Sequence, residues 1–337
     1  MASDNGNIKR GLIEKVIKEQ IFNLERVKDT FDDRFNYLRL DKNERLLPFS
    51  REALQRFRDG ITFEGLSGYG ELGGIYRRLA DFLGVEADNV FLATGSDLAI
   101  KSIYESCVEG GDNVVLHGPC YAMERVYAKM FGAEARIMPV RADWTVDTEA
   151  MLKAVDERTK LVLLENPNGF VGTKPSREEI VNCAAWLQER QVLLLVDECY
   201  IYVENHHSDI VSLLRDYKNI VISQSFSKGH GLAGVRCGFL IGDAALLSYI
   251  SRVRPMHEIT NLTALAVAWV LDNPGLLREY QEAVRSAKVY LGEALRKLQI
   301  PFRDTHANFI LLYLPDEGRT AGITEAFTPH DLRRTAR

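Results

Sequence analysis

The chain has 337 residues, of which 46% are hydrophobic and 26% are charged, and this composition excludes a disordered or low-complexity protein. Its 42 lysines and arginines nearly balance 47 aspartates and glutamates, so the net charge of −5 does not indicate a nucleic-acid partner. A chain of this length predicts one large domain together with a smaller one.

Neither a secretion signal nor a membrane span is indicated. Residues 1–10 are polar, and the longest apolar run, near residues 262–271, is well short of the roughly 20 residues that a spanning helix needs. The five cysteines are odd in number and form no CxxC pair, which argues against a disulfide framework and a zinc site. We therefore expect a cytoplasmic protein with no membrane partner and no metal.

Apolar residues recur at helical spacing over residues 8–31, which predicts an amphipathic helix before the main body. Short β-branched runs then alternate with longer helical patterns. The strands are predicted at residues 90–93, 114–117, 137–140, 161–164, 193–196, 220–223 and 237–241. The helices between them are predicted at residues 96–107, 123–130, 148–155 and 176–189. This alternation predicts an α/β domain whose mostly parallel, seven-stranded sheet is covered by helices.

After residue 255 the pattern becomes helical and ends in one strand-like run. The two helices are predicted at residues 261–271 and 276–298, and the strand at residues 308–314. We expect three parts: an N-terminal arm with part of a small domain, a large domain, and a small C-terminal domain, at residues 1–66, 67–255 and 256–337.

Polar residues directly after the predicted strands are candidates for a site, because ligands of open α/β sheets bind at the carboxyl ends of the strands. Gly95, Ser96 and Asp97 follow the first strand and begin a helix, where free backbone N–H groups can bind a phosphate. A plain helix cap is the alternative. Asp197 follows the fifth strand, where a buried carboxylate needs a cation or hydrogen bonds unless it caps the next turn.

Ser225, Ser227, Lys228 and Arg236 follow the sixth strand, among small residues that allow close approach of the backbone. Any single lysine in such a bend is more often a solvated surface residue. Together, however, an anion site, a carboxylate, a lysine and an arginine match what pyridoxal phosphate needs: a phosphate site, an acid for the ring nitrogen and an amine for a Schiff base.

Short motifs along the chain stand in the order found in one known family. They are Leu40-Asp41-Lys42-Asn43-Glu44, Gly68-Tyr69-Gly70, Gly95-Ser96-Asp97, Pro119-Cys120-Tyr121, Asn166-Pro167-Asn168, Asp197-Glu198-Cys199-Tyr200, Ser225-Phe226-Ser227-Lys228, Ala233-Gly234-Val235-Arg236-Cys237-Gly238 and Asn308-Phe309. Over about residues 38–314 the chain resembles the fold-type I enzymes of pyridoxal phosphate, in particular the histidinol-phosphate aminotransferase branch of class I and II. The resemblance implies that fold, that cofactor and a biosynthetic role in amino acid metabolism.

The resemblance also implies residue roles. Lys228 would form the Schiff base and move the substrate proton, Asp197 would keep the ring nitrogen protonated, and Tyr200 would donate to the ring oxygen O3′. Tyr121 would stack on the ring, although core packing is the alternative for both tyrosines. The phosphate would be held by Gly95, Ser96, Asp97, Ser225, Ser227 and Arg236. Tyr69 would reach the phosphate of a neighbouring subunit, which implies a homodimer with shared active sites.

Two departures from the family stand out. Gly169 occupies the position of an asparagine that donates to O3′, and Asn168 could replace that donor only if the loop shifts. The family's C-terminal arginine, which grips the substrate, has no evident counterpart, so we expect a truncated small domain. The sequence predicts an aminotransferase for a small amino acid or amino-phosphate donor and a keto acceptor. A decarboxylase of a phosphorylated amino acid and a catalytically impaired binding protein are the alternatives.

Overall fold

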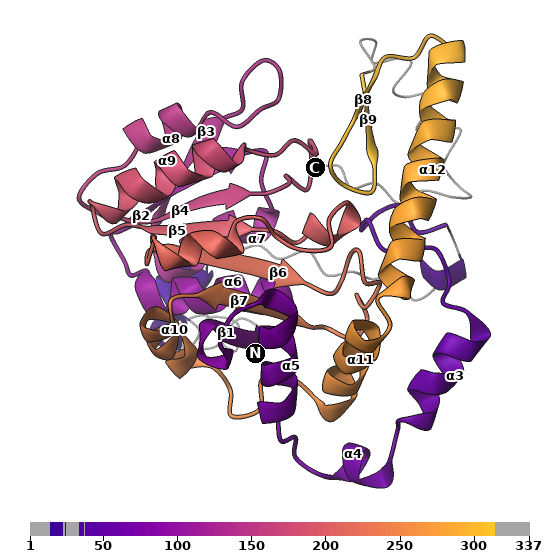
Figure 1. Cartoon of the computed structure of the whole chain (residues 1–337). Coiled ribbons are helices and arrows are strands. Elements are labelled where there is room, and N and C mark those ends of the chain that lie inside the picture. Colours follow the sequence, from indigo (N-terminus) through magenta and orange to yellow (C-terminus); the bar gives the residue numbers. More distant parts are fainter. Residues whose placement is uncertain (1–13, 23, 25–33, 37, 314–337) are drawn as a thin grey trace, which may run out of the picture.

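A seven-stranded sheet forms the centre of the computed structural model, which describes residues 14–22, 24, 34–36 and 38–313 (Figure 1). The strand order is β1-β7-β6-β5-β4-β2-β3, and all pairs are parallel except those that β7 forms with β1 and β6. All seven predicted strands are confirmed, as β1 (Val90–Ala93), β2 (Asn113–Gly118), β3 (Glu134–Pro139), β4 (Thr159–Glu165), β5 (Leu193–Asp197), β6 (Ile220–Ser225) and β7 (Gly238–Gly242).

Helices of the described chain follow the predicted pattern closely. The six predicted after the N-terminal arm are α6 (Gly95–Cys107), α7 (Ala122–Phe131), α8 (Thr148–Lys153), α9 (Arg177–Gln188), α11 (Asn261–Asp272) and α12 (Gly275–Lys297). Additional helices are α3 (Arg51–Asp59), α4 (Phe63–Ser67), α5 (Gly73–Leu83) and α10 (Ala244–Ile250), with 3₁₀ turns at η1 (Arg34–Asn36), η2 (Ala87–Asn89), η3 (Ile201–Val203), η4 (Val211–Arg215) and η5 (Ser251–Val253). None of the described helices has both the length and the apolar character needed to cross a bilayer.

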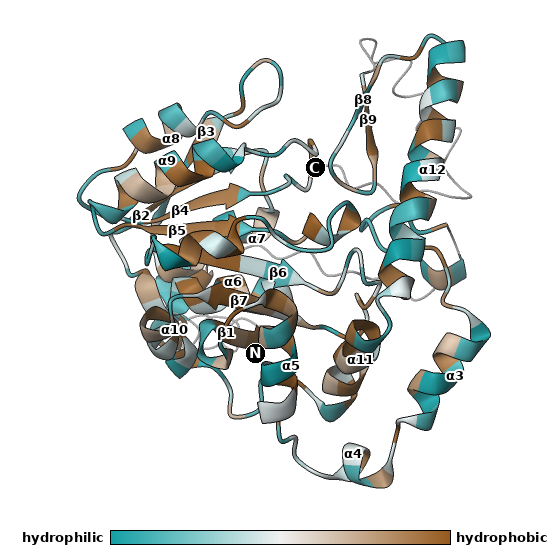
Figure 2. Ribbon diagram, viewed as in Figure 1, coloured by the Kyte–Doolittle hydropathy of each residue, from teal (hydrophilic) through white to brown (hydrophobic). Residues whose placement is uncertain are grey.

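Both faces of the sheet are buried. In β5, Leu194 and Val196 join one hydrophobic cluster, whereas Leu193 and Leu195 join the other. Helices α5, α8, α9 and α11 supply the first cluster, and α6, α7 and α10 supply the second (Figure 1). Two-sided burial explains why the central strands contain continuous apolar runs, which are coloured as hydrophobic in β5, whereas the last residues of β6 are polar (Figure 2).

The last described segments stand beside the sheet rather than on it. Helix α12 packs against a hairpin of β8 (Phe302–Asp304) and β9 (Ile310–Leu312), which pair antiparallel (Figure 1). The strand predicted at residues 308–314 is therefore present but shorter, and its partner was not predicted. The domain limits at residues 66 and 255 stay predictions.

The single long helix predicted over residues 8–31 is wrong within the described residues. Ile17 and Lys18 are not helical, and α2 (Glu19–Phe22) has four residues. Val16 is 62% exposed and Phe22 is 46% exposed, so the apolar face lacks the packing that stabilises most helices. The rest of that segment and the basic C-terminal tail lie outside the described residues.

The carboxyl ends of β4, β5 and β6 meet at one edge of the sheet. Glu165 pairs with Asp197, and Asp197 pairs with Ser223, so the polar residues that end these strands are neighbours. Ser225 pairs with Gly238 of β7, which also pairs with the last residue of β1. The loop to Lys228 and the start of α6 are thereby brought to the same edge.

Candidate active site

The N-terminus of α6 packs directly against Arg236 and β7. Gly95 has a φ angle of 83°, and a Cβ atom there would overlap the Arg236 guanidinium. A Cβ atom on Gly238 would overlap the backbone nitrogen of Ser96. Both positions therefore require glycine, and the result is an arginine beside the free N–H groups of a helix start, where a negative charge is stabilised.

Hydroxyl groups surround the same point. The Ser225 Oγ atom accepts a hydrogen bond from the Ser227 backbone nitrogen at 3.1 Å, and the Ser96 Oγ atom lies 2.9 Å from the Cys199 Sγ atom. Arg236 donates to the Ala233 carbonyl at 3.2 Å, and no carboxylate of the described chain forms an ion pair with it. A helix start, hydroxyls and an unpaired arginine form a donor set that fits a phosphate group.

Asp97 turns its side chain toward α7 rather than toward this donor set. Its Oδ1 atom accepts hydrogen bonds from the Tyr127 hydroxyl at 2.8 Å and from the Tyr121 hydroxyl at 3.3 Å. A second anion would repel a phosphate, so the only contribution of Asp97 that suits an anion is its backbone N–H. Tyr121 is 39% exposed at the start of α7, and its stacking on a ring stays a prediction.

Lys228 lies in the loop after β6 and is half-buried. Its Nζ atom donates to the Lys42 carbonyl at 2.6 Å and lies 5.1 Å from the centroid of the Tyr200 ring. Loss of hydration lowers the pKa of the Lys228 amine, although nearby Asp197 acts in the opposite direction. A lowered pKa increases the neutral fraction of the amine, which is the form that attacks a carbonyl carbon.

Asp197 is the buried last residue of β5. Its Oδ1 atom accepts a hydrogen bond from the Cys199 backbone nitrogen at 3.1 Å, and no described cation forms an ion pair with it. Burial raises the pKa of Asp197 to about 6, so the carboxyl group is mostly ionised at neutral pH. A buried carboxylate of this kind fits a cationic partner such as a protonated ring nitrogen.

Tyr200 joins segments that are far apart in the sequence. Its hydroxyl oxygen accepts a hydrogen bond from the Asn43 side chain at 3.0 Å, and the Asn308 side chain donates to the Asn43 carbonyl at 3.0 Å. Burial raises the pKa of Tyr200, so the hydroxyl keeps its proton and can donate it. The motifs at residues 40–44 and 308–309, which had no assigned role, thus meet beside the predicted cofactor residues.

The Asn168 side chain is used within its own loop. Its Nδ2 atom donates to the Pro119 carbonyl at 2.8 Å, and its Oδ1 atom accepts from Phe170 and Val171 at 2.7 and 2.8 Å. These contacts engage both ends of the Asn168 amide, and its role as the replacement donor stays a prediction.

Tyr69 differs from the other predicted site residues in its exposure and in its contacts. Its side chain is 87% exposed, and its ring stacks on His257 with centroids 4.7 Å apart. No hydrogen bond within the described chain connects Tyr69 to Lys228 or Arg236. A role toward the neighbouring subunit's phosphate stays a prediction.

Glu165 and Glu124 are site residues that sequence reasoning missed. The Glu165 carboxyl group is buried beside Asp197, and it accepts hydrogen bonds from the backbone nitrogens of Tyr121 and Gly169, each at 2.6 Å. Burial raises the pKa of Glu165 and of the fully buried Glu124. A signal was available for Glu165, because a carboxylate at the end of a buried strand is what singled out Asp197.

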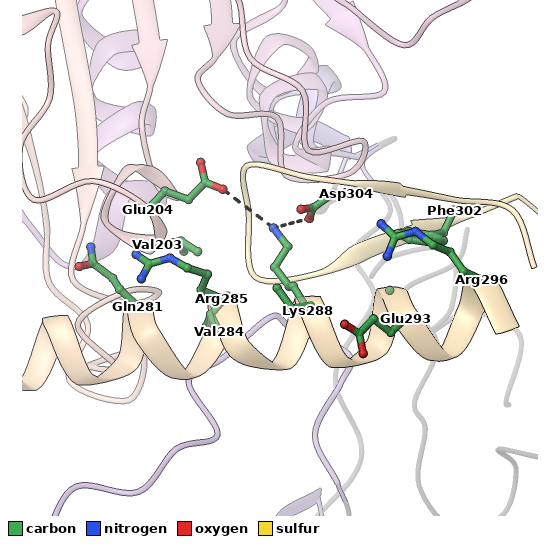
Figure 3. A pocket seen from close by; sticks show the side chains of 12 residues that line it. Val203, Glu204, Gln281, Val284, Arg285, Lys288, Glu293, Arg296, Phe302 and Asp304 are labelled. Atoms are coloured by element: carbon green, nitrogen blue, oxygen red, sulfur yellow. Dashed lines mark ion pairs between the residues drawn. The ribbon is translucent and has the colours of Figure 1, made fainter.

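A separate cavity of about 450 Å³ lies between α12 and β8 (Figure 3). Lys288 in its wall already pairs with Asp304 at 2.7 Å and faces Glu204 at 3.9 Å. None of the predicted site residues lines this cavity. The described residues therefore place the candidate active site at the edge of the sheet and not here.

Known proteins match most of the chain. The family model described as aminotransferase class I and II matches residues 35–327. Histidinol-phosphate aminotransferase 2 of Pseudomonas fluorescens is 31% identical over 290 residues, which are 84% of this chain and 76% of the relative. The histidinol-phosphate aminotransferase of Symbiobacterium thermophilum is 30% identical over 84% of this chain and 77% of the relative.

Solved structures confirm the predicted fold. The crystal structure of histidinol-phosphate aminotransferase from Sinorhizobium meliloti in complex with pyridoxal-5′-phosphate has a TM-score of 0.85 and 22% identity, over 96% of this chain and 90% of that one. Aspartate aminotransferase from Thermus thermophilus with maleate has a TM-score of 0.78 and 17% identity, over 92% and 89%. With the family match over residues 35–327, the chain belongs to the class I and II aminotransferases.

Proposed function

We propose that this aminotransferase binds pyridoxal phosphate covalently at Lys228 and transfers an amino group between a small amino acid or amino-phosphate compound and a keto acceptor. The observation that supports the proposal most is that one sheet edge carries an amine, a buried carboxylate and an arginine at a helix start. When bound, pyridoxal phosphate supplies an electron sink for the carbon that loses its proton.

Lys228 has two tasks in this proposal. Its neutral amine, which burial favours, would hold the aldehyde carbon of the cofactor, and the aldehyde oxygen would leave as water. When the amine of the substrate takes its place, the free Lys228 amine would be the group that carries a proton between the substrate Cα atom and the cofactor. The hydrogen bond to the Lys42 carbonyl would orient the Nζ atom when it is not attached to the cofactor.

Asp197 and Arg236 orient the cofactor from opposite ends. The ionised Asp197 carboxylate stabilises a protonated ring nitrogen, which makes the ring a stronger acceptor of electrons. Arg236 and the first backbone N–H groups of α6 hold the phosphate, and the Tyr200 hydroxyl donates to the ring oxygen O3′. The cofactor would thereby be held by the end of β5, the segment after it, the segment before β7 and the start of α6, all at the same edge of the sheet.

A second copy of the chain completes the site in this proposal. Tyr69 is 87% exposed, and the neighbouring apolar side chains Phe63, Leu66 and Met256 are 76%, 62% and 88% exposed. Exposed apolar residues that gather in this way are typical of an interface between subunits. In a homodimer, the Tyr69 hydroxyl of one subunit would donate to the phosphate held by the other.

The relatives favour transamination over the two alternatives. The curated relatives that match most of the chain are named as aminotransferases, and the chain retains Lys228, Asp197 and Arg236. A decarboxylase of a phosphorylated amino acid or an inert binding protein is not favoured by these matches. The identity of the amino donor is what the next experiment determines.

A half-reaction screen tests the proposal. The protein loaded with pyridoxal phosphate is mixed with single amino acids and amino phosphates, and its absorbance is followed for conversion of the cofactor to its amine form. At least one donor should convert the cofactor without release of carbon dioxide. Release of carbon dioxide with no need for a keto acceptor, or no conversion by any donor, would contradict the proposal.

A further inference from the structure

The Glu165 carboxyl group occupies the space next to Gly169 and Tyr200. Its Oε2 atom lies 3.5 Å from the position that a Cβ atom on Gly169 would take, and that position is 3.1 Å from the Tyr200 ring. A side chain at residue 169 would therefore have to share this space with Glu165. Because residue 169 is glycine, the Glu165 carboxyl group at the end of β4 shares this space with no side chain from residue 169.

The surroundings of Glu165 disfavour its ionised form. Its side chain is buried at the end of β4, and burial and nearby Asp197 raise the pKa of its carboxyl group, although the hydrogen bonds from the Gly169 and Tyr121 backbone act in the opposite direction. Asp197 is the register neighbour on β5, and Glu124 of α7 and Cys120 interact electrostatically with Glu165. The ionisable groups that face it from the surrounding elements are Asp197, Glu124, Cys120, Tyr200 and the neutral His117, and none of them is a cation.

Hydrogen bonds fix the orientation of the carboxyl group. Oε1 accepts from the Tyr121 backbone and Oε2 accepts from the Gly169 backbone, both at 2.6 Å. Each oxygen uses one lone pair in these bonds, so a proton on either oxygen is still free to be donated. A protonated carboxyl group held in this way accepts these two bonds and still has one proton to donate.

We infer that Glu165, as an un-ionised carboxylic acid, donates a hydrogen bond to the ring oxygen of the cofactor on the side where Tyr200 lies. The inference rests on the proposed function, because it requires pyridoxal phosphate at Lys228. Glu165 thereby supplies the donor that Gly169 lacks and that the contacts of Asn168 do not provide. A donor at this oxygen stabilises its negative charge and so weakens its hold on the proton of the neighbouring lysine nitrogen.

The pH midpoint of the change in cofactor absorbance gives the pKa of that proton. We compare wild-type protein loaded with pyridoxal phosphate with Glu165→Gln, whose amide keeps a donor, and Glu165→Leu, which removes it. The midpoint should stay within about 0.3 units in Glu165→Gln and rise by about one unit in Glu165→Leu, a tenfold change in the ionisation constant. An unchanged or lowered midpoint in Glu165→Leu would overturn the inference.

Glu165→Gln alone also discriminates between protonation states. If Glu165 were ionised, the neutral amide would remove a negative charge and lower the midpoint by about one unit or more. Such a decrease contradicts a protonated Glu165. Should Glu165→Leu fail to fold, infrared spectra of wild type and Glu165→Gln decide at pH 7, because the carbonyl band of an un-ionised acid must be lost with Glu165.

Trapping of the cofactor on Lys228 separates this inference from the proposed function. Borohydride treatment and mass spectrometry are applied to wild type and to both variants before titration. If no adduct forms on Lys228 even in wild type, the proposed function fails. If the adduct forms and the midpoint of Glu165→Leu does not rise, the inference fails while the proposed function stands.

Discussion

The two halves of the sheet edge carry opposite charge. The half formed by α6, β6 and β7 presents glycines, hydroxyls and the Arg236 guanidinium, whereas the half formed by β4 and β5 presents the carboxyl groups of Glu165 and Asp197. Lys228 lies in the loop between β6 and β7, and its Nζ atom is 5.1 Å from the centroid of the Tyr200 ring. The difference indicates a ligand that is anionic at one end and cationic at the other, as pyridoxal phosphate with a protonated ring is.

Removal of the Lys228 amine should have the largest effect on the reaction rate. Lys228→Ala is expected to slow conversion of the cofactor to its amine form by roughly 10⁴-fold or more, because both the covalent link and the proton carrier are lost. Lys218→Ala is the matched control, since this lysine is exposed and pairs with Asp243 at 3.5 Å. Wild-type rates in Lys228→Ala would contradict the proposed role of Lys228.

Replacement of the Asp197 carboxylate by a neutral amide should have the next largest effect on the reaction rate. In Asp197→Asn the ring nitrogen loses its anionic partner, and kcat is expected to fall by roughly 10² to 10³-fold while the cofactor stays attached. Asp216→Asn, at an exposed position, controls for the loss of one negative charge. Rates of the half-reaction in stopped flow provide the measurement, and equal rates in both variants would rule out this role of Asp197.

A larger side chain in the half formed by α6, β6 and β7 should have a smaller effect, and that effect should be on cofactor binding. Gly95→Ala places a Cβ atom against Arg236 on a backbone whose φ angle is 83°. The strain and the displaced guanidinium are expected to weaken pyridoxal phosphate binding by roughly tenfold. Gly74→Ala, where nothing lies within 4 Å of the added atom, should bind the cofactor as wild type does in the same fluorescence titration.

The last prediction concerns the pH dependence of stability, where no effect on the rate of the reaction is needed. The unfolded chain ionises Glu165 near pH 4.3, whereas burial keeps this group protonated in the folded protein, so it destabilises the fold as the pH rises. Relative to Glu165→Gln, the wild-type apoprotein should lose at most about 1.4 kcal/mol per pH unit between pH 5 and 7. Urea unfolding measures this difference, and parallel pH profiles would show that Glu165 is ionised in the fold.

The sheet was predictable because its signal is local. Each strand of the large domain is a short apolar run, the first five alternate with helical patterns, and two-sided burial favours such runs. The three-residue strand β8 carries too few residues for a pattern, and the helix expected over residues 8–31 needed a packing partner that its apolar residues do not find within the described chain.

The two halves of the edge differed in how much could be predicted. The lysine loop was found because Ser225, Ser227, Lys228 and Arg236 lie within one short stretch of sequence. Glu165 was not found, because its environment comes from β5, α7 and the loop at Gly169, which meet only in the fold. Its position alone was predictable, because Glu165, like Asp197, is a carboxylate at the end of a buried strand.

The most direct test of the account is to locate the cofactor on the chain. Protein loaded with pyridoxal phosphate is reduced with borohydride, digested and analysed by mass spectrometry. The account predicts a single modified peptide, with the added mass on Lys228. Modification of another lysine, or no modification while the cofactor remains bound, would contradict the claim that this edge of the sheet is the active site.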